Sequence, residues 1–472
     1  MSKIGPLSQK SLFYLFLMTS TLLMMSMLLV VLRPNGRISS LDLRLFPRAN
    51  ENLVVRSSSV EISNEEEEDQ LGLRDCEILK VFMYDLPPQF HFALLGWKGG
   101  GNGASVWPDV RASEVPEYPG GLNLQHSVEY WLTLDLLSSE FERNLSGRSA
   151  VRVHDPRLAD VVFVPFFASI SYNKFSKVKV GQRSVDDLLQ EKLVRFLTSR
   201  EEWKRSGGKD HIIVAHHPNS LLSSRMKLWP ATYVLADFGR YPLSVANVEK
   251  DVIAPYVHLA QNYLDDRSDF DSRPTLLYFQ GAIYRKAGGT IRQELYYMLQ
   301  DEKDVHFAFG SIKGDGISNA SLGMQQSKFC LNIAGDTPSS NRLFDAIASH
   351  CVPVIISDEI ELPYEDILDY SEFSVFVSRE DALKENFLIT MIRNIGREEW
   401  TKMWRRLKEV EQFFEFRYPS RPNDAVQMIW QAIARRVPAV TRKVNRASRF
   451  SETAESSGET WLWSAPLPRN FT

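Results

Sequence analysis

The chain contains 472 residues, of which 44% are hydrophobic, and its 55 lysines and arginines nearly balance its 59 aspartates and glutamates, leaving a formal net charge of −4. This balance argues against a nucleic-acid-binding protein, which would need a strongly basic face. A chain of this length and apolar content can bury more than one hydrophobic core, so we expect two α/β domains.

An uncharged apolar segment stands near the N-terminus, at residues 12–32. It is long enough to cross a bilayer as a helix, and residues 33–36 lack the small-residue pattern of a signal-peptide cleavage site. We therefore predict a cytosolic tail at residues 1–11 and a retained transmembrane signal-anchor at residues 12–32. Residues 33–75 are polar and include an acidic run, which indicates a disordered acidic stem.

Apolar runs that end in polar residues indicate the strands of the first predicted domain, residues 76–270. One run ends at His216 and His217, and the next ends at Asp237. Ligands collect at the carboxyl ends of strands in open parallel sheets, so these side chains are candidate site residues. A structural histidine is the alternative role for either imidazole. Helices of this domain are expected at residues 185–203 and 251–264.

The second predicted domain, residues 271–440, opens with a strand at residues 275–280. Gly281 and Arg285 follow its carboxyl end, and a glycine pair then precedes a helix. A glycine-rich turn, a basic side chain and a helix start are typical of phosphate sites in dinucleotide folds, although the Walker lysine pattern of ATPases is absent. An ordinary surface arginine is the alternative. A further helix is expected at residues 379–395 and a loose tail at residues 441–472.

Residues 328–357 read as a strand–loop–helix–strand unit. The unit begins with alternating apolar residues and ends with an uninterrupted apolar run, as parallel strands do. Ser339 or Ser340 is expected to cap the helix between the strands, and one side of that helix bears Arg342 and Asp345. The tight turn before the helix directs backbone N–H groups and the positive end of the helix dipole toward one point, where an anion would bind.

Two interpretations of this unit are open from the residues alone. In the first, the turn that starts at Gly335 and the Arg342 guanidinium bind a diphosphate, and Asp345 accepts hydrogen bonds from ribose hydroxyls. In the second, Arg342 and Asp345 form an ordinary exposed pair on a capped helix. Cys330 and Cys351 lie at the same end of the two strands, so a disulfide and two buried free thiols are both open.

Several short motifs of this chain carry a family resemblance. They are Tyr-Asp-Leu-Pro at residues 84–87, Asp-Pro-Arg-Leu-Ala-Asp at 155–160 and, between residues 329 and 364, Phe-Cys-Leu, Gly-Asp-Thr-Pro-Ser-Ser, Arg-Leu-Phe-Asp-Ala-Ile, Cys-Val-Pro-Val-Ile-Ile-Ser and Glu-Leu-Pro-Tyr. Together they resemble the exostosin-type glycosyltransferase family, and its plant branch, similar to arabinosyltransferases of cell-wall polysaccharides, most of all. The resemblance implies an α/β protein of GT-B architecture, in which two Rossmann-like domains face a cleft.

The resemblance also implies an enzyme that moves a sugar from a nucleotide-sugar donor, a UDP-sugar in our expectation, to a glycan acceptor with inversion. The donor would bind the second domain through Gly281, Arg285, Gly335, Ser339, Ser340, Arg342 and Asp345. Arg292 is expected to be structural. One of His216, His217 and Asp237 would take the acceptor proton, and the arginines would stabilise the leaving diphosphate without a metal or any further cofactor.

The family is tethered in the Golgi membrane, with the catalytic part in the lumen. A luminal location favours the Cys330–Cys351 disulfide and fits the glycosylation sequons at Asn144, Asn319 and Asn470. We therefore expect a single-pass type II protein of the Golgi membrane. The arginines that follow residues 12–32 outnumber the lysines before them and favour the opposite orientation, which we overrule on these grounds.

Two rival functions stand beside this one. The first is a catalytically inert GT-B scaffold that forms a homo- or heterodimer with a related glycosyltransferase in a Golgi complex. The second is a GT-A enzyme that binds a metal through Asp269 and Asp271. In GT-A enzymes this Asp-x-Asp pattern follows a strand, whereas in this chain it precedes one. A solvated linker is the favoured reading of that pattern.

Overall fold

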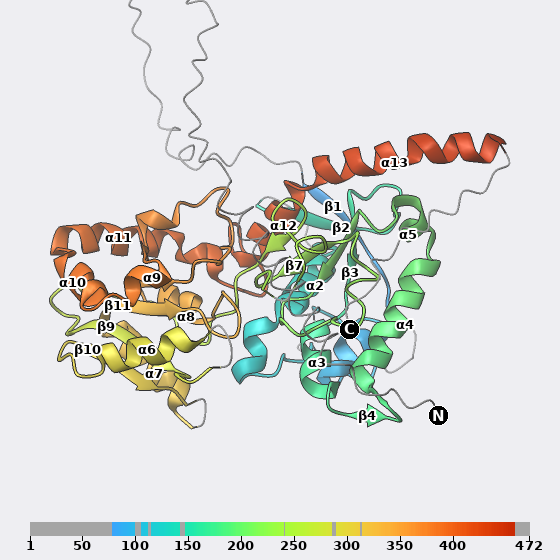
Figure 1. Ribbon diagram of the computed structural model, residues 1–472. Coiled ribbons are helices and arrows are strands. Elements are labelled where there is room, and N and C mark those ends of the chain that lie inside the picture. The colour runs from blue at the N-terminus through green and yellow to red at the C-terminus, as the bar shows by residue number, and fades with distance from the viewer. Residues whose placement is uncertain are drawn as a thin grey trace, which may run out of the picture. The chain divides into compact units, whose positions relative to one another are not determined.

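Two parallel β-sheets, one from each half of the described chain, form the frame of the structure (Figure 1). This computed structural model describes residues 78–99, 105–111, 115–141, 147–239, 241–285, 289–311 and 314–457. Within these ranges, no helix has both the length and the apolar character needed to span a membrane. The predicted anchor and stem, Cys76, Asn144 and Asn470 lie outside the described residues.

The first sheet has the strand order β2-β1-β3-β6-β7-β8, and all its pairs are parallel. Its strands are β1 (Leu79–Met83), β2 (Ala150–Val153), β3 (Val161–Val164), β6 (His211–Val214), β7 (Thr232–Leu235) and β8 (Val252–Ile253). The middle strands β3, β6 and β7 are buried along their whole length, as expected for parallel strands. The same half contains α2 (Val128–Ser139), α3 (Ala168–Phe175), α4 (Val185–Ser199), α5 (Glu201–Ser206), the 3-10 helices η1 (Pro88–Phe90), η2 (Phe92–Leu95) and η3 (Gly121–His126), and a hairpin of β4 (Lys179–Val180) and β5 (Arg183–Ser184).

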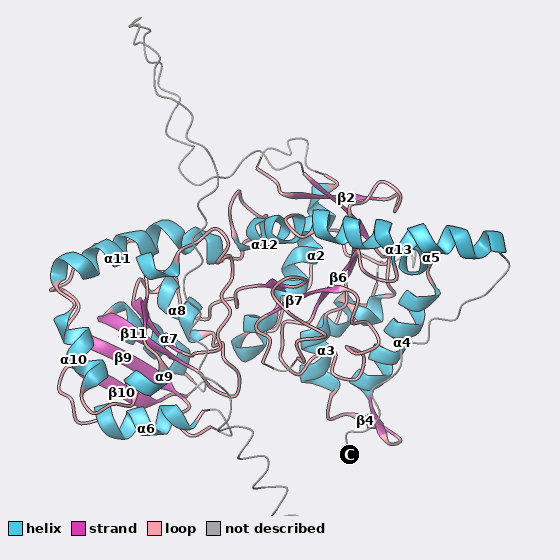
Figure 2. Ribbon diagram, turned by 45° about the horizontal axis from the view of Figure 1, so that its top comes forward, coloured by secondary structure: helices cyan, strands magenta, loops and turns pink. Residues whose placement is uncertain are grey.

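The second sheet has the strand order β10-β9-β11-β12-β13, again with parallel pairs. Its strands are β9 (Thr275–Gly281), β10 (Val305–Phe309), β11 (Ser327–Ile333), β12 (Val352–Ile356) and β13 (Val375–Phe376). Figure 2 shows β9, β10 and β11 side by side with helices around them. The later half contains α6 (Thr290–Leu299), α7 (Gly316–Gln325), α8 (Arg342–Ala348), α9 (Arg379–Ala382), α10 (Phe387–Asn394), α11 (Arg397–Val410), α12 (Ala425–Ala434), α13 (Val437–Ser457), η4 (Tyr370–Glu372) and η5 (Glu411–Phe414).

The helix predicted at residues 251–264 is wrong. Val252–Ile253 form β8, which pairs with β7, and the chain from residue 254 to residue 274 contains no helix. Both side chains of β8 are β-branched, and Pro255 lacks the backbone N–H that a continuing helix would need. Tertiary pairing with β7 therefore decides the conformation here.

Two other predicted helices are interrupted. The helix expected at residues 379–395 divides into α9 and α10, because Asn386 between them adopts a φ of 56° in the left-handed region. The helix expected at residues 185–203 divides into α4 and α5 at Arg200, whose ψ of 145° is extended. A single residue outside the helical region is enough to break the hydrogen-bond ladder at each place.

The expected loose tail is also corrected in its first part, because α13 continues to Ser457. Pro438 stands in its first turn, where a proline costs no hydrogen bond, and arginine, lysine, alanine and glutamate recur along the helix. Local helix propensity therefore outweighs the polar composition that indicated a loose segment.

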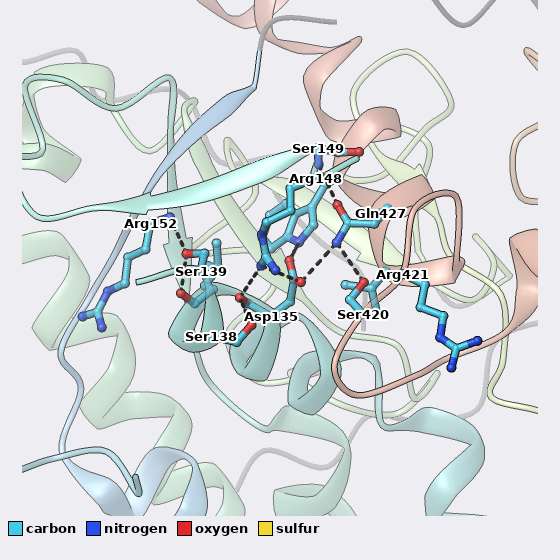
Figure 3. Close-up of polar contacts among 12 residues, drawn as sticks. Asp135, Ser138, Ser139, Arg148, Ser149, Arg152, Ser420, Arg421 and Gln427 are labelled. Atoms are coloured by element: carbon cyan, nitrogen blue, oxygen red, sulfur yellow. Dashed lines mark hydrogen bonds and ion pairs between the residues drawn. The ribbon is translucent and has the colours of Figure 1, made fainter. Parts of the chain in front are cut away.

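The C-terminal helix α12 returns to the first half of the chain and packs against α2, β1 and β2. A buried polar network around Asp135 of α2 joins them (Figure 3). The Asp135 carboxylate accepts hydrogen bonds from Arg148 Nη2 at 2.8 Å, Gln427 Nε2 at 3.1 Å and Trp430 Nε1 at 2.9 Å. Gln427 Oε1 accepts the Ser149 backbone N–H at 2.6 Å. Because α11 packs against β12, the closing helices contact both sheets.

A disulfide bond joins Cys330 of β11 to Cys351, which directly precedes β12. Both cysteines are buried, together with Tyr278, Met324 and Ala346. The bond joins the middle of β11 to the residue just before β12 and so cross-links two neighbouring strands of the second sheet. Its role in this fold is therefore structural.

Replacing both Cys330 and Cys351 with alanine is expected to lower the free energy of unfolding. The bond closes a loop with a sequence separation of 21 residues, and removing such a constraint from the unfolded chain typically costs about 2–4 kcal/mol. Urea unfolding measures the change. A thiol reductant should lower the wild-type midpoint and leave the double variant unchanged, whereas equal midpoints for both proteins would contradict the prediction.

Candidate active site

A pocket of about 700 Å³ is lined by segments that follow the carboxyl ends of strands in both sheets. The first half contributes residues from 122–126, 217–219 and 256–260, and the second half contributes residues from 280–292, 310–324 and 335–345. The two sheets therefore present the same kind of edge to one cavity, as the sequence prediction of a cleft requires.

Most of the side chains predicted to form the site line this pocket. They are His217, Gly281, Arg285, Gly335, Ser339, Ser340, Arg342 and Asp345. His216 and Asp237 are buried beside it and are not among its lining residues. The pocket also contains Arg292 and His126, which the sequence prediction did not assign to the site.

Arg342 lies against the turn that follows β9. Its Nε donates to Gln280 O at 3.1 Å, its Nη1 donates to Ser340 Oγ at 3.0 Å, and its guanidinium carbon lies 4.9 Å from the centre of the Phe279 ring. A Cβ on Gly281 would lie 2.0 Å from Arg342 Nη2, so only glycine admits the guanidinium here. Burial lowers the pKa of Arg342 to about 10, which leaves it charged at neutral pH.

Two more arginines approach the same point. Arg285 is 36% exposed and pairs with Asp336 at 3.2 Å. Arg292 is buried and, among the described residues, donates to the backbone carbonyls of Ala282, Ile333 and Ala334. Burial, followed by the charges of Arg342 and Arg285, lowers its pKa to about 8.

The cluster of Arg285, Arg292 and Arg342 is therefore short of negative charge. Among the described residues, Asp336 is the carboxylate that forms an ion pair with it. Arg292 bears most of the electrostatic cost of this arrangement, because burying a cation without a counter-ion is unfavourable in free energy. An anionic ligand in the pocket would supply the missing charge.

The turn before α8 differs from the prediction. Asn341 stands at the N-cap of α8 and makes no side-chain cap bond, while Ser340 Oγ accepts the backbone N–H of Arg342, the first helical residue, at 3.5 Å. The Gly335 N–H donates to Thr337 O at 3.0 Å, so this amide is already satisfied. Because α8 is also short, the positive charge of the arginines dominates the electrostatics of the pocket.

Ser339 joins the two halves of the chain. Its hydroxyl donates to Asp237 Oδ2, beyond the end of β7, and forms a hydrogen bond of 2.8 Å with Tyr256 Oη. The second oxygen of Asp237 accepts the Gly239 N–H at 2.9 Å. Both carboxylate oxygens of Asp237 are thus engaged within the protein, which makes it a poor candidate for the general base.

Asp345 also binds backbone across the pocket. Its Oδ1 accepts N–H groups of Leu259 at 2.6 Å and Ala260 at 3.0 Å, and its Oδ2 accepts Asn341 Nδ2 at 2.9 Å. Burial raises the pKa of this carboxyl group, and the backbone N–H bonds oppose that effect. Arg342 and Asp345 are both partly buried, so the reading of an exposed surface pair is wrong.

His126, His217 and Tyr256 form the other wall of the pocket, and the buried His216 contacts His126. His126 Nδ1 lies 2.9 Å from His216 Nδ1, and the rings of His126 and His217 lie 4.7 Å apart. The Tyr256 ring lies 5.1 Å from that of His126. Burial lowers the pKa of His216 to about 3 and that of His217 to about 4, so these imidazoles are neutral at neutral pH.

The Exostosin GT47 domain matches residues 75–394 of this chain, a span that includes both sheets and every residue that lines the pocket. The chain belongs to the exostosin GT47 family. "Probable arabinosyltransferase ARAD1" of Arabidopsis thaliana is 39% identical to it over 374 residues, which cover 79% of this chain and 81% of the relative. "Probable glucuronoxylan glucuronosyltransferase IRX7" of the same species is 24% identical over 79% of each chain.

Among solved structures, TarM aligns with this GT47 chain at a TM-score of 0.29 and 9% identity, covering 64% of this chain and 58% of TarM. That likeness is too weak to bear on the site. Family membership and the activities in the relatives' names make this GT47 chain a glycosyltransferase.

The GT47 site does not use the Asp-x-Asp pattern of the linker. Asp269 accepts the Ser272 N–H at 2.9 Å, Asp271 pairs with Arg397, and neither lines the pocket. The GT-A reading fails on this geometry. Asn319 lies exposed on α7, and its glycosylation stays a prediction.

The sequence prediction missed His126 and expected Arg292 to be structural, and Arg292 does bind backbone carbonyls while it also lines the pocket. His126 ends a 3-10 helix after a long loop, where no strand-end pattern points to a site. Arg292 stands in the first turn of α6, and only the packing of that helix directs its side chain to the carboxyl ends of β9 and β11. A buried arginine beside two glycines of the pocket is the signal that could have identified it.

Proposed function

We propose that this GT47 enzyme transfers a sugar from a UDP-sugar to a cell-wall polysaccharide acceptor, with inversion and without a metal. The observation that carries the proposal is the charge of the pocket, where Arg285, Arg292 and Arg342 converge with one paired carboxylate. In this proposal the two sheets are the lobes of a GT-B enzyme. The second holds the donor and the first holds the acceptor.

The arginines suit a leaving nucleoside diphosphate. When the bond between the anomeric carbon and the diphosphate breaks, negative charge develops on the departing oxygen, and fixed cations in a cavity shielded from water stabilise that charge. Arg342 keeps Nη2 available beside Gly281, and Arg285 can turn from Asp336 to the ligand because it is partly exposed. Arg292 is held in place by its hydrogen bonds to backbone carbonyls, so it contributes positive charge to the pocket without moving.

The names of the relatives support a narrower substrate class. The 39% identical relative is named as an arabinosyltransferase, and the more distant one as acting on glucuronoxylan. We therefore propose a pentose, arabinose in the first instance, as the sugar and a plant cell-wall polysaccharide as the acceptor. The chemistry at the anomeric carbon is the same for either sugar class.

The proposed location is the Golgi membrane, with the catalytic part in the lumen. The apolar segment at residues 12–32, the Cys330–Cys351 bond and the exposed sequon at Asn319 support it, because disulfides persist in oxidising compartments. Protease protection of a tagged C-terminus in intact Golgi vesicles tests the orientation. Digestion without detergent would overturn it.

Titration of the full-length chain with UDP is expected to show saturable binding, because among the described residues a single carboxylate, that of Asp336, forms an ion pair with the three arginines of the cluster. Transfer from a UDP-pentose to a wall polysaccharide should continue in excess EDTA, since charge stabilisation by arginine needs no metal. Product analysis by NMR should show inverted anomeric configuration. Absence of UDP binding would contradict the donor site, and binding without transfer from any donor would indicate the inert scaffold.

A further inference from the structure

The histidine wall of the pocket contains a hydrogen-bond chain whose direction can be worked out. His216 Nε2 lies 3.2 Å from the carbonyl oxygen of Ala254. A carbonyl only accepts, so this nitrogen of His216 carries the hydrogen. Burial keeps His216 neutral, and its Nδ1 is therefore an acceptor.

The acceptor on His216 determines the state of His126. Because the two Nδ1 atoms lie 2.9 Å apart and that of His216 has no hydrogen, Nδ1 of His126 must donate. Burial, followed by the nearby His216 and His217, lowers the pKa of His126 well below its ordinary value, so this ring is neutral too. A neutral imidazole with its hydrogen on Nδ1 has an unshared electron pair on Nε2.

The electron pair on His126 Nε2 is available to a ligand in the pocket. His126 is 4% exposed and lines the cavity, whereas His216, which occupies its Nδ1 edge, does not. Within the described part of the chain, His126 Nε2 has no hydrogen-bond partner. The charged or titratable groups that face the ring are His216, His217 and Tyr256, and none of them is a carboxylate.

His217 has the opposite arrangement. Its Nδ1 accepts the backbone N–H of Asn219 at 3.1 Å, so the hydrogen of the neutral ring is on Nε2. His217 therefore offers the pocket a donor, which can bind a sugar oxygen and cannot take a proton through that atom.

We propose that His126 Nε2 is the general base of the transfer and that His216 is the positioning residue that keeps it in the reactive tautomer. The proposal rests on the proposed function. The acceptor hydroxyl gives its proton to Nε2, its oxygen forms a bond to the anomeric carbon, and the bond from that carbon to the UDP oxygen breaks. The products are the glycosylated acceptor, UDP and an imidazolium that releases the proton to solvent.

The surroundings of His126 suit a general base both before and during proton transfer. Before the reaction, burial disfavours protonation of His126, so Nε2 keeps its electron pair for the acceptor hydroxyl. During the reaction, the diphosphate gains negative charge as it departs, and this charge in the same pocket favours the imidazolium. The acid limb of the pH profile of kcat/KM should consequently lie below pH 6.5, the ordinary imidazole value.

The decisive comparison uses five variants of the full-length chain. His126→Ala is expected to lower kcat by about 10²–10⁴-fold, the usual contribution of a general base, with unchanged UDP affinity and partial rescue by added imidazole. His217→Ala removes one hydrogen bond and should lower activity by at most about tenfold, without rescue. His216→Asn, which keeps an acceptor, should be more active than His216→Leu, and His154→Ala, at a 73% exposed side chain, should behave as the wild type.

Nitrogen-15 NMR of histidine-labelled protein tests the tautomers independently of transfer. His126 should carry its hydrogen on Nδ1 and His217 on Nε2. The opposite tautomer for His126, or a His126→Ala variant with wild-type kcat, overturns the inference even if UDP binds normally. Loss of UDP binding in the wild type would instead remove the proposed function.

Discussion

Replacing Arg342 with alanine is expected to slow sugar transfer by about 10²–10³-fold, the usual cost of removing one group that stabilises developing negative charge. The side chain of Arg342 lies against the turn that follows β9, with Nη2 beside Gly281, and within the described part of the chain no carboxylate forms an ion pair with it. Its charge is therefore free to meet a leaving diphosphate. The measurement is the initial rate of transfer from a UDP-pentose, with the melting temperature recorded for each protein.

Two further variants make this result specific. Arg342→Lys keeps a charge and loses the planar fork, so its rate should fall between those of the wild type and Arg342→Ala. Arg393→Ala removes a 42% exposed arginine that pairs with Glu302 and Asp304, and it should leave the rate unchanged. Wild-type turnover in a folded Arg342→Ala protein would refute the donor site.

Replacing Asp135 with alanine is expected to lower the free energy of unfolding by about 3–5 kcal/mol, because it removes one partner of a buried ion pair. The side chains of Asp135 and Arg148 are 1% and 5% exposed, so water cannot replace the missing carboxylate. Gln427 and Trp430 of α12 lose their acceptor at the same time (Figure 3). Urea unfolding, followed by tryptophan fluorescence, measures the loss.

The matched control is an exposed aspartate. Asp304→Ala breaks a pair at the surface and should cost no more than about 1 kcal/mol. Asp135→Leu combined with Arg148→Met replaces both members of the buried pair with apolar side chains and should be more stable than Asp135→Ala. Equal losses for Asp135→Ala and Asp304→Ala would contradict the importance of this network.

Local patterns were enough to predict the strands and the donor segment. The strand at residues 352–356 is a continuous apolar run, and the strand at residues 275–281 is apolar in its middle. Arg285 follows the strand at 275–281 and Arg342 precedes the strand at 352–356, as expected for a parallel crossover. The carboxyl ends of neighbouring parallel strands meet at one edge, so residues far apart in sequence come together by topology alone. The pocket contains both arginines for this reason.

Hydrogen-bond partners and tautomers depended on the tertiary structure. The sequence predicted that Ser339 and Asp345 would bind a ligand. In the folded chain, Ser339 donates a hydrogen bond to Asp237, and Asp345 accepts hydrogen bonds from the backbone of residues 259–260. Each contact joins residues 85 or more positions apart, and no local pattern predicts such a pairing. The same is true of His126, whose partner His216 is 90 residues away.

The amino-acid sequence by itself determined the two parallel sheets, the family motifs and the positions of two donor-side arginines, because hydrophobic periodicity and turn residues act over a few neighbouring residues. Only the tertiary structure decided which side chains remain free in the pocket. Burial and long-range hydrogen bonds settle the charge of Arg292 and the tautomer of His126, and both effects arise only when distant segments pack together.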